Sequence, residues 1–328
     1  MKKHSNNRFI DRSWLRGRPW PAVCAILALL FPLQVRAEES RGAGIAHVDC
    51  RYEQTGRSPS ADAPSSGLQG FPANDVFRPL LADPKQPQFF ASWQVTEIRS
   101  TDDNVNIGAV GIGDNIGLVG RRNGCDGWQV GIFAGVWAQF DMDESSYPLL
   151  NADYQVGIPF SWRRGIVSSR VRLLHQSSHL GDELLLSDPS LVRVNLSTEA
   201  IDALVSIDVK QWGRLYGGGI YLINPDPETL DSGGLQFGFE LRGATKPGFL
   251  SKWLPGFRRT LVAGADFKSW EENHWNIDSS VVGGVEISKE GSDRRLRLLV
   301  NYYYGHAPYG QFFTEKIEQI GFGLYSSF

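Results

Sequence analysis

The sequence contains no run of apolar residues long enough to form a transmembrane helix. Such a helix needs about 20 predominantly apolar residues, and the longest apolar run, residues 21–33, has 13. Charge is scarce as well: Asp, Glu, Lys and Arg make up 21% of the 328 residues, and the formal net charge is −3. Disordered chains have a high net charge and few aromatic residues, whereas 12% of this chain is aromatic. These properties exclude a helical membrane protein and a disordered chain, and they leave a soluble β-rich protein or a β-barrel membrane protein.

Residues 1–37 have the features of a secretory signal peptide. Six Lys and Arg residues precede the apolar run, and Val35-Arg36-Ala37 forms a cleavage site before Glu38. An uncleaved membrane anchor is the alternative, but 13 apolar residues are few for a membrane span. Cleavage leaves 26 basic and 35 acidic residues, a net charge of −9, since the leader carries seven Lys and Arg residues and one Asp. We expect an exported protein with no nucleic-acid partner, because phosphates attract a basic surface.

From Phe89 onward, apolar and polar residues alternate with a period of two. Trp128 and Val130, for example, alternate with Gln129 and Gly131, which is the pattern of a strand with one apolar face. About twelve segments carry this pattern: 89–100, 106–122, 128–141, 151–163, 166–178, 191–209, 214–223, 234–244, 259–270, 275–288, 294–304 and 316–328. The segments are about ten or more residues long and often end in Trp or Tyr, as expected of tilted membrane strands with aromatic girdles. We therefore predict an all-β fold, an antiparallel transmembrane β-barrel of about twelve strands, with a two-sheet soluble barrel in the periplasm as the alternative.

The connectors between these segments alternate in length. Short turns alternate with longer loops, as in outer-membrane barrels with both termini in the periplasm, although the long connector 246–257 breaks the rule. The predicted organisation is a signal peptide at 1–37, an irregular N-terminal periplasmic segment at 38–85 and a barrel in the bacterial outer membrane at 86–328. The terminal Phe328 resembles the signal that delivers such barrels to the outer-membrane assembly machinery, which is therefore an expected partner.

Two cysteines, Cys50 and Cys125, remain after removal of the leader, which carries Cys24. Two cysteines in an exported protein can form one disulfide. The predicted topology places Cys125 in a periplasmic turn and Cys50 in the periplasmic N-terminal segment. We expect a disulfide that ties this segment to the barrel, and two free thiols are the alternative.

One motif contains polar residues that the formation of a barrel wall does not require. It is His175-Gln176-Ser177, near the end of the fifth segment. On this strand Arg170 and Arg172 would be costly on a face toward lipid, so the alternating residues His175 and Ser177 are predicted to face outward. Residues two apart on one strand face have Cα atoms about 6.5–7 Å apart, which is close enough for an imidazole and a hydroxyl to meet.

The neighbouring segment also carries polar residues on its predicted outward face. Glu199 and Asn195 share the parity of the apolar Ile201. A hairpin pairs His175 with a residue near 195–199, depending on the register. A hydroxyl nucleophile, an imidazole base and an acceptor that orients the base are the groups of nucleophilic catalysis. The candidates are Ser177 as nucleophile, His175 as base and either Glu199 or Asn195 as acceptor.

This constellation resembles the sites of outer-membrane phospholipase A and the outer-membrane lipid A deacylase, which use a His-x-Ser pair on the external barrel wall. A carboxamide or carboxylate from the adjacent strand completes their sites, and the phospholipase also has twelve strands. The resemblance implies that Ser177 attacks an acyl ester, that His175 is its base, and that Glu199 or Asn195 holds the imidazole. In those enzymes Asn follows the serine, whereas Ser178 follows it here.

The phospholipase requires calcium, so the resemblance also implies Ca²⁺ as a cofactor. Asp182 and Glu183 follow the motif and are the candidate ligands, because calcium prefers carboxylate oxygens. The implied partner is membrane lipid or lipopolysaccharide.

Two stretches of the chain, one of which contains the His175-Gln176-Ser177 motif, resemble those of a bacterial envelope family, domain of unknown function 1207. They are residues 79–87, PLLADPKQP, and residues 175–183, HQSSHLGDE. This resemblance covers most of the mature chain and implies an envelope protein without specifying an activity. The functional hypothesis is lipid acyl-ester hydrolysis at the outer leaflet. The alternative is a non-catalytic envelope barrel, either a narrow channel or a structural protein.

Overall fold

The computed structural model describes residues 67–72, 75–187, 196–248, 256–289 and 294–327. The strands are β1 (Leu68–Gly70), β2 (Phe89–Ile98), β3 (Asp103–Asn123), β4 (Asp126–Asp141), β5 (Leu149–Arg164), β6 (Val167–Leu180), β7 (Leu196–Val209), β8 (Gly213–Asp226), β9 (Gly233–Arg242), β10 (Lys246–Pro247), β11 (Phe257–Trp270), β12 (Ile277–Lys289), β13 (Arg295–His306) and β14 (Lys316–Ser327). A short helix, α2 (Asp182–Ser187), follows β6, and a 3-10 turn, η2 (Gly310–Phe312), lies between β13 and β14. The predicted signal peptide lies outside the described residues. Within them, no helix is long and apolar enough to cross a membrane.

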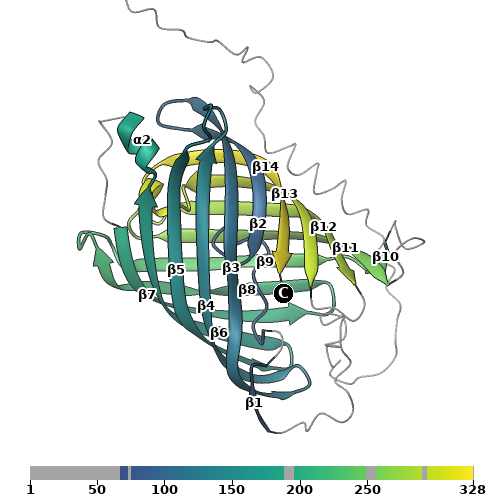
Figure 1. Cartoon of the computed structure of the whole chain (residues 1–328). Coiled ribbons are helices and arrows are strands. Elements are labelled where there is room, and N and C mark those ends of the chain that lie inside the picture. Colours follow the sequence, from purple (N-terminus) through teal and green to yellow (C-terminus); the bar gives the residue numbers. More distant parts are fainter. Residues whose placement is uncertain (1–66, 73–74, 188–195, 249–255, 290–293, 328) are drawn as a thin grey trace, which may run out of the picture. The chain divides into compact units, whose positions relative to one another are not determined.

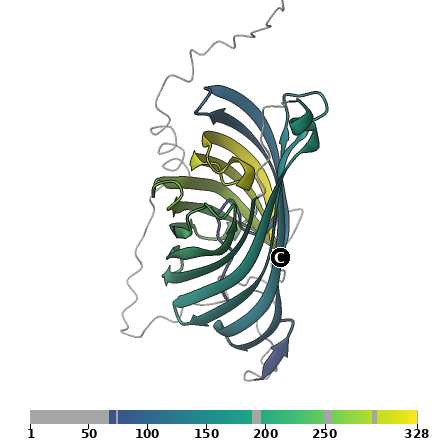
Figure 2. The same ribbon diagram turned by 90° about the vertical axis from the view of Figure 1, so that its left-hand side faces the viewer.

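Twelve strands form a closed antiparallel barrel (Figures 1 and 2). Each strand from β2 to β9 pairs with the next along the chain, β9 pairs with β11, and the pairing continues to β14. The barrel closes where β14 pairs with β2, from Ile317 opposite Ile98 to Ser326 opposite Phe89. The short strands β1 and β10 pair with β3 and β11 and are not part of the ring. The predicted twelve-strand antiparallel barrel is confirmed.

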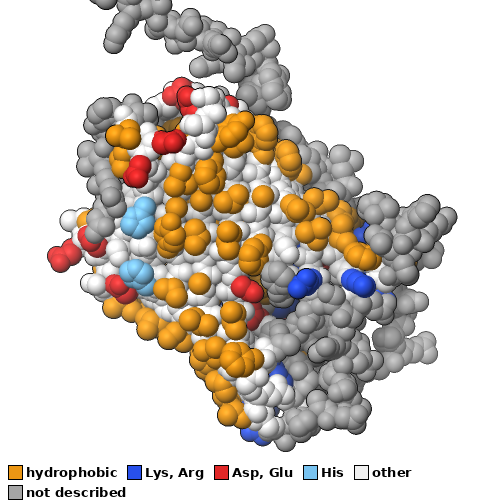
Figure 3. All heavy atoms as spheres, in the orientation of Figure 1, with side chains coloured by type: hydrophobic (Ala, Val, Ile, Leu, Met, Phe, Trp, Pro, Cys, Tyr) orange, Lys and Arg blue, Asp and Glu red, His pale blue; other side chains and the backbone are white. Residues whose placement is uncertain are grey.

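Alternation distributes the side chains of each strand between the outer wall and the lumen. On β5, Ile158 and Phe160 are 57% and 46% exposed, whereas Ser161 on the other face is buried. Apolar side chains cover much of the wall seen in Figure 3. The lumen face carries buried charged residues, among them Arg163, Arg170, Asp202, Asp208, Arg214, Glu240, Asp266 and Glu286. An exposed apolar wall around a polar interior is typical of a barrel surrounded by lipid.

The connectors follow the predicted alternation of short turns and longer loops. Gly124 and Cys125 link β3 to β4, and Gly165 and Ile166 link β5 to β6. Both glycines have a positive φ, 63° and 61°, which glycine adopts at no steric cost. At the opposite end the loops are longer, for example between β13 and β14. Short turns are periplasmic in outer-membrane barrels, so we name the short-turn end of the barrel periplasmic and the other end extracellular.

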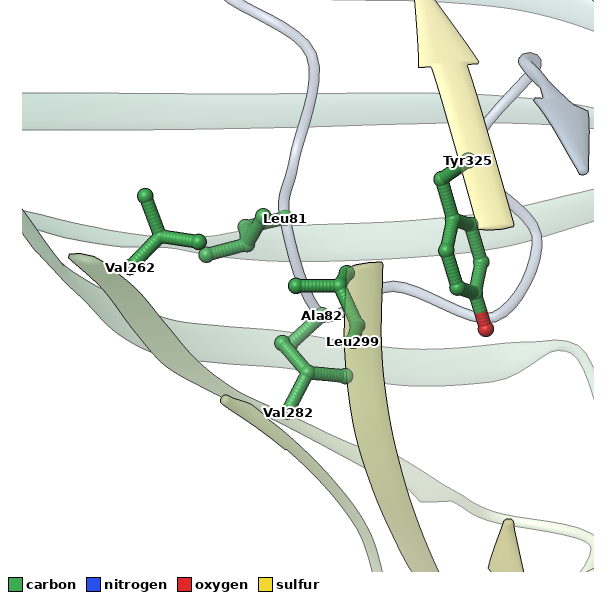
Figure 4. Packing of buried hydrophobic residues seen from close by; sticks show 6 residues of the cluster. All are labelled: Leu81, Ala82, Val262, Val282, Leu299 and Tyr325. Carbon is green, nitrogen blue, oxygen red and sulfur yellow. The ribbon is translucent and has the colours of Figure 1, made fainter. Parts of the chain in front are cut away.

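Residues 75–88, which we call the plug segment, lie inside the barrel. Its side chains Val76, Phe77, Leu80, Leu81 and Ala82 are all buried. Phe77 and Leu80 pack against Leu204 and Tyr216, and Leu81 and Ala82 pack against Val262, Val282 and Leu299 (Figure 4). The sequence did not predict that this segment occupies the lumen.

Ion pairs join the plug segment to charges on the lumen face. Arg78 pairs with Asp208 on β7, Lys85 with Asp153 on β5, and Asp83 with Lys268 on β11. The backbone N–H of Leu81 also donates a hydrogen bond of 2.8 Å to Glu240 Oε1. A buried charge without a partner is costly, so the plug segment supplies the compensation that these lumen charges need.

The stretch Gly113-Asp114-Asn115, which interrupts the alternation in the sequence, is part of the continuous strand β3 and contacts the plug segment. Asn115 Nδ2 donates a hydrogen bond to Asp75 Oδ1. A Cβ atom at position 113 would lie 2.8 Å from the carbonyl oxygen of Ala134 and 3.3 Å from Pro87 Cα. Glycine at this position therefore permits the close approach of the plug backbone to the wall.

The loop between β13 and β14 folds inward at the extracellular end. The Gly310 N–H donates to Asp153 Oδ2 at 2.9 Å, and Gln311 Nε2 donates to the carbonyl oxygen of Ser178 at 2.8 Å. Lys85 Nζ of the plug segment lies 4.5 Å from the ring centroid of Tyr309. The loop and the plug segment therefore meet around Asp153.

Candidate functional site

The outer wall carries a contact between an imidazole and a carboxylate toward its extracellular end. His175 on β6 lies opposite Glu199 on β7, and His175 Nδ1 is 2.8 Å from Glu199 Oε1. Their side chains are 44% and 40% exposed, and they share the outward face with Leu173 and Ile201, which are also exposed. The register thus brings Glu199 to His175, as one of the two predicted alternatives requires. The other alternative, Asn195, lies outside the described residues.

Ser177 lies two residues after His175 on the same face of β6. In the register it is opposite Tyr154 on β5 and Ser197 on β7. The described part of the chain has no hydrogen bond between the Ser177 hydroxyl and His175, and such contacts are often long in sites without substrate. Because Glu199 contacts Nδ1, Nε2 is the ring nitrogen that remains to accept a proton from a hydroxyl.

Asn224 on β8 completes this polar group and was missed by sequence reasoning. Its Nδ2 donates a hydrogen bond of 2.8 Å to Glu199 Oε2. The pairing of β7 with β8 shifts between Glu199 and Ala200, so that Ile223 is left without a counterpart and Asn224 lies opposite Glu199. A β-bulge of this kind redirects a side chain. Because the alternation in the sequence ends at residue 223, the sequence alone predicts that Asn224 lies in a loop.

The residues on either side of Ser177 face away from this group. Ser178 is buried and its hydroxyl donates to Asp153 in the lumen, so the residue that is Asn in the phospholipase pattern does not belong to the outer surface here. His179 returns to the outward side, where its ring makes an edge contact with Tyr154 at a centroid distance of 5.8 Å. The outward group thus comprises hydroxyl, imidazole, carboxylate and carboxamide groups from three adjacent strands.

The two candidate calcium ligands lie at the start of α2. Glu183 Oε2 accepts a hydrogen bond of 3.3 Å from Ser146 Oγ in the loop between β4 and β5, and Asp182 is exposed. Over the described ranges, no group of three or more His, Cys, Asp or Glu side chains could hold a metal ion. Calcium binding by Asp182 and Glu183 stays a prediction.

Cys125 lies in the periplasmic turn between β3 and β4, as predicted, and it is disulfide-bonded. Cys50 lies outside the described residues. The pairing of Cys50 with Cys125 therefore stays a prediction.

A carboxylate, an imidazole and a hydroxyl in this order can perform nucleophilic acyl transfer. The carboxylate fixes the ring orientation and stabilises the imidazolium, the imidazole removes the hydroxyl proton, and the hydroxyl oxygen attacks a carbonyl carbon. The group is accessible from the outer side of the wall and is separate from the lumen.

Several solved outer-membrane structures are similar to this barrel. Outer-membrane phospholipase A from Escherichia coli has a TM-score of 0.45 and 12% identity, over 77% of this chain and 95% of that chain. The β domain of the Bordetella autotransporter BrkA has a TM-score of 0.41 and 12% identity, over 74% of this chain and 98% of that chain. The KdgM porin has a TM-score of 0.35 and 6% identity, over 71% of this chain and 97% of that chain.

At the level of sequence, no curated protein matches the chain. One family model, described as "Protein of unknown function (DUF1207)", matches residues 55–328. The match includes the plug segment, the barrel strands and the whole outward polar group.

Proposed function

The chain belongs to the DUF1207 family, and we propose that it is an outer-membrane serine hydrolase that cleaves lipid acyl esters at the outer leaflet. Ser177 is the nucleophile, His175 is the general base, Glu199 orients the imidazole, and Asn224 holds Glu199. We also propose that the barrel lies in the outer membrane, which its exposed apolar wall supports, and that its partners are membrane lipid or lipopolysaccharide and the outer-membrane assembly machinery.

The observation that carries this proposal is the 2.8 Å contact between His175 Nδ1 and Glu199 Oε1 beside Ser177. Apolar residues are favoured on a wall that faces lipid, so a pair of polar side chains at such a position indicates a function. Here the polar residues are in register across β6, β7 and β8. The carboxylate contacts the imidazole, and the hydroxyl of Ser177 lies two residues away on the same face of β6, so the three kinds of group that acyl transfer requires are grouped on one face of the wall.

The surroundings of the polar group support a lipid ester as substrate. The next outward residues toward the periplasm are Leu173 and Ile201, which lie opposite each other and are exposed. An acyl chain can lie along this apolar wall while its ester carbonyl reaches Ser177. A soluble ester would gain nothing from such a wall, since burial of apolar surface is the main favourable term in binding an acyl chain.

The reaction proceeds in two steps. Ser177 Oγ bonds to the ester carbonyl carbon while His175 Nε2 takes the hydroxyl proton, and collapse of the tetrahedral intermediate releases the alcohol, which receives that proton. Water then attacks the acyl-enzyme with His175 again as base, and the fatty acid leaves as Ser177 regains its proton.

The proposal is tested by fatty-acid release from phospholipid and lipid A in mixed micelles with the purified protein. We expect turnover by the wild type and a loss on the order of 10⁴-fold for Ser177→Ala. Ser169→Ala is the matched control, because Ser169 lies on the same face of β6, and it should retain full activity. Absence of turnover with both lipids, with and without calcium, contradicts the proposal.

A further inference from the structure

A second candidate site lies inside the barrel, away from the outward polar group. A cavity of about 190 Å³ at the extracellular end has the plug residues Asp83, Pro84 and Lys85 in its lining. Its lining also includes residues of the three loops that follow β8, β11 and β13. Asp231, in the first of these loops, is exposed, so the cavity reaches the protein surface.

The lining of this cavity has an excess of negative charge. Among the described residues that line it, six are Asp or Glu and three are Lys or Arg. Each of the three cations already has a carboxylate partner: Lys268 pairs with Asp83, Arg172 with Asp202 and Lys85 with Asp153. In the described part of the chain, Asp231, Asp266 and Glu272 have no Lys or Arg within ion-pair distance. The unbalanced charge therefore favours a cationic occupant.

One buried carboxylate oxygen of the lining is left without a hydrogen bond. Asp202 is 2% exposed; its Oδ2 accepts from Arg172 Nε at 2.6 Å, but Oδ1 has no hydrogen-bond partner. The guanidinium of Arg170 is 3.7 Å from Oδ1, which is beyond hydrogen-bond distance. Arg170 Nη2 has no hydrogen-bond partner either. Because buried polar atoms in native proteins nearly always have a partner, a water molecule or a ligand group between these two atoms is expected here.

The aromatic side chains of the lining distinguish an organic cation from a bare metal ion. Trp270, Tyr303, Tyr309 and Phe313 line the cavity together with the carboxylates. Aromatic faces attract ammonium groups and pack against alkyl carbon, and the same protein already places Lys85 Nζ 4.5 Å from the Tyr309 ring centroid. The volume is smaller than the roughly 300–1,000 Å³ of sites for drug-sized ligands, so the occupant is a small molecule.

We propose that this cavity binds a small organic amine from the extracellular side, with its ammonium groups among the carboxylates and its carbon chain against the aromatic rings. The proposal does not depend on the hydrolase function, because the cavity lies on the lumen side of the wall. Binding and hydrolysis can therefore fail or succeed separately.

The experiment is calorimetric titration of the purified wild-type protein in detergent. The probe is 1,4-diaminobutane, with uncharged 1,4-butanediol and CaCl₂ as comparisons. We expect saturable binding of the diamine and none of the diol. Failure of the diamine to bind, or binding of Ca²⁺ or the diol without the diamine, would overturn the proposal.

Variants then locate the binding. The double variant Asp231→Asn/Glu272→Gln removes two lining charges and should weaken diamine affinity about tenfold. The control Asp103→Asn/Glu144→Gln removes two exposed charges that do not line the cavity, one at the first residue of β3 and one in the loop between β4 and β5, and its affinity should equal that of the wild type. A second variant, Trp270→Ala, should weaken binding without a change in charge. Equal weakening by the lining and control variants would place the amine elsewhere and overturn the proposal; circular dichroism checks that each variant is folded.

Discussion

Asn224 Nδ2 donates a hydrogen bond of 2.8 Å to Glu199 Oε2, the carboxylate oxygen that His175 does not contact. The two oxygens of one carboxylate thus have two different partners, from β6 and β8. This division fixes the plane of the carboxylate on an exposed wall, where a lone Glu side chain would have several rotamers.

If Glu199 orients His175, loss of Asn224 should reduce catalysis without abolishing it. For Asn224→Ala we expect kcat for ester hydrolysis to fall up to about 100-fold, because a misplaced base loses its alignment. KM should change little, since Asn224 holds Glu199 and does not contact the acyl chain in the proposed site. Stopped-assay kinetics on a lipid ester measure both constants. A change confined to KM would contradict this role for Asn224.

The twelve strands could be predicted because alternation is a local property of the sequence. The pattern around Trp128 and the other segments required only that one face be apolar. The contact between His175 and Glu199 could be narrowed only to residues 195–199, because the register of a hairpin with a long loop is set by three-dimensional pairing. The position of Asn224 opposite Glu199 depends on a bulge at Ile223, which an alternation pattern does not reveal.

The plug segment could not be predicted because it has no period. Its apolar residues Phe77 and Leu80 read as part of an irregular stretch rich in proline. One signal was present: Phe133 and Trp137 lie on the face of β4 that otherwise carries polar residues and glycine. Large aromatic side chains on a lumen face need something to pack against, and both are buried in the structure.

The plug segment has a consequence for the channel alternative. Because residues 75–88 occupy the lumen and pair with charges on β5, β7 and β11, we expect the full chain to show no steady conductance in a planar bilayer. Deletion of residues 75–86 should produce open-channel current. Steady current through the full chain would show that the plug segment does not block the lumen and would favour the narrow channel.

The pair between Lys85 and Asp153 should contribute to stability. Both side chains are buried, and Lys85→Met would leave the Asp153 carboxylate without its cation. We expect the free energy of unfolding to fall by about 3–5 kcal/mol, measured by chemical denaturation in detergent. The double variant Lys85→Met/Asp153→Asn should recover part of this loss. No difference between the single variant and the wild type would show that the pair does not anchor the plug segment.

The disulfide prediction concerns the covalent state of Cys125. We expect mass spectrometry of the mature protein, digested without reductant, to yield one cross-linked peptide that contains Cys50 and Cys125. Reductant should convert the cross-linked peptide into two peptides whose summed mass is larger by two hydrogen atoms. Alkylation of both cysteines in the unreduced protein would show two free thiols and contradict the prediction.

The central claim is that Ser177 is an activated nucleophile on the outer wall. The direct measurement is covalent labelling of the purified barrel with a fluorophosphonate, followed by mapping of the labelled peptide. We expect label on Ser177, none on Ser169 of the same strand face, and loss of label in His175→Ala, because an unactivated serine hydroxyl is a weak nucleophile. Absence of label on Ser177, or equal labelling of Ser177 and Ser169, would contradict this claim.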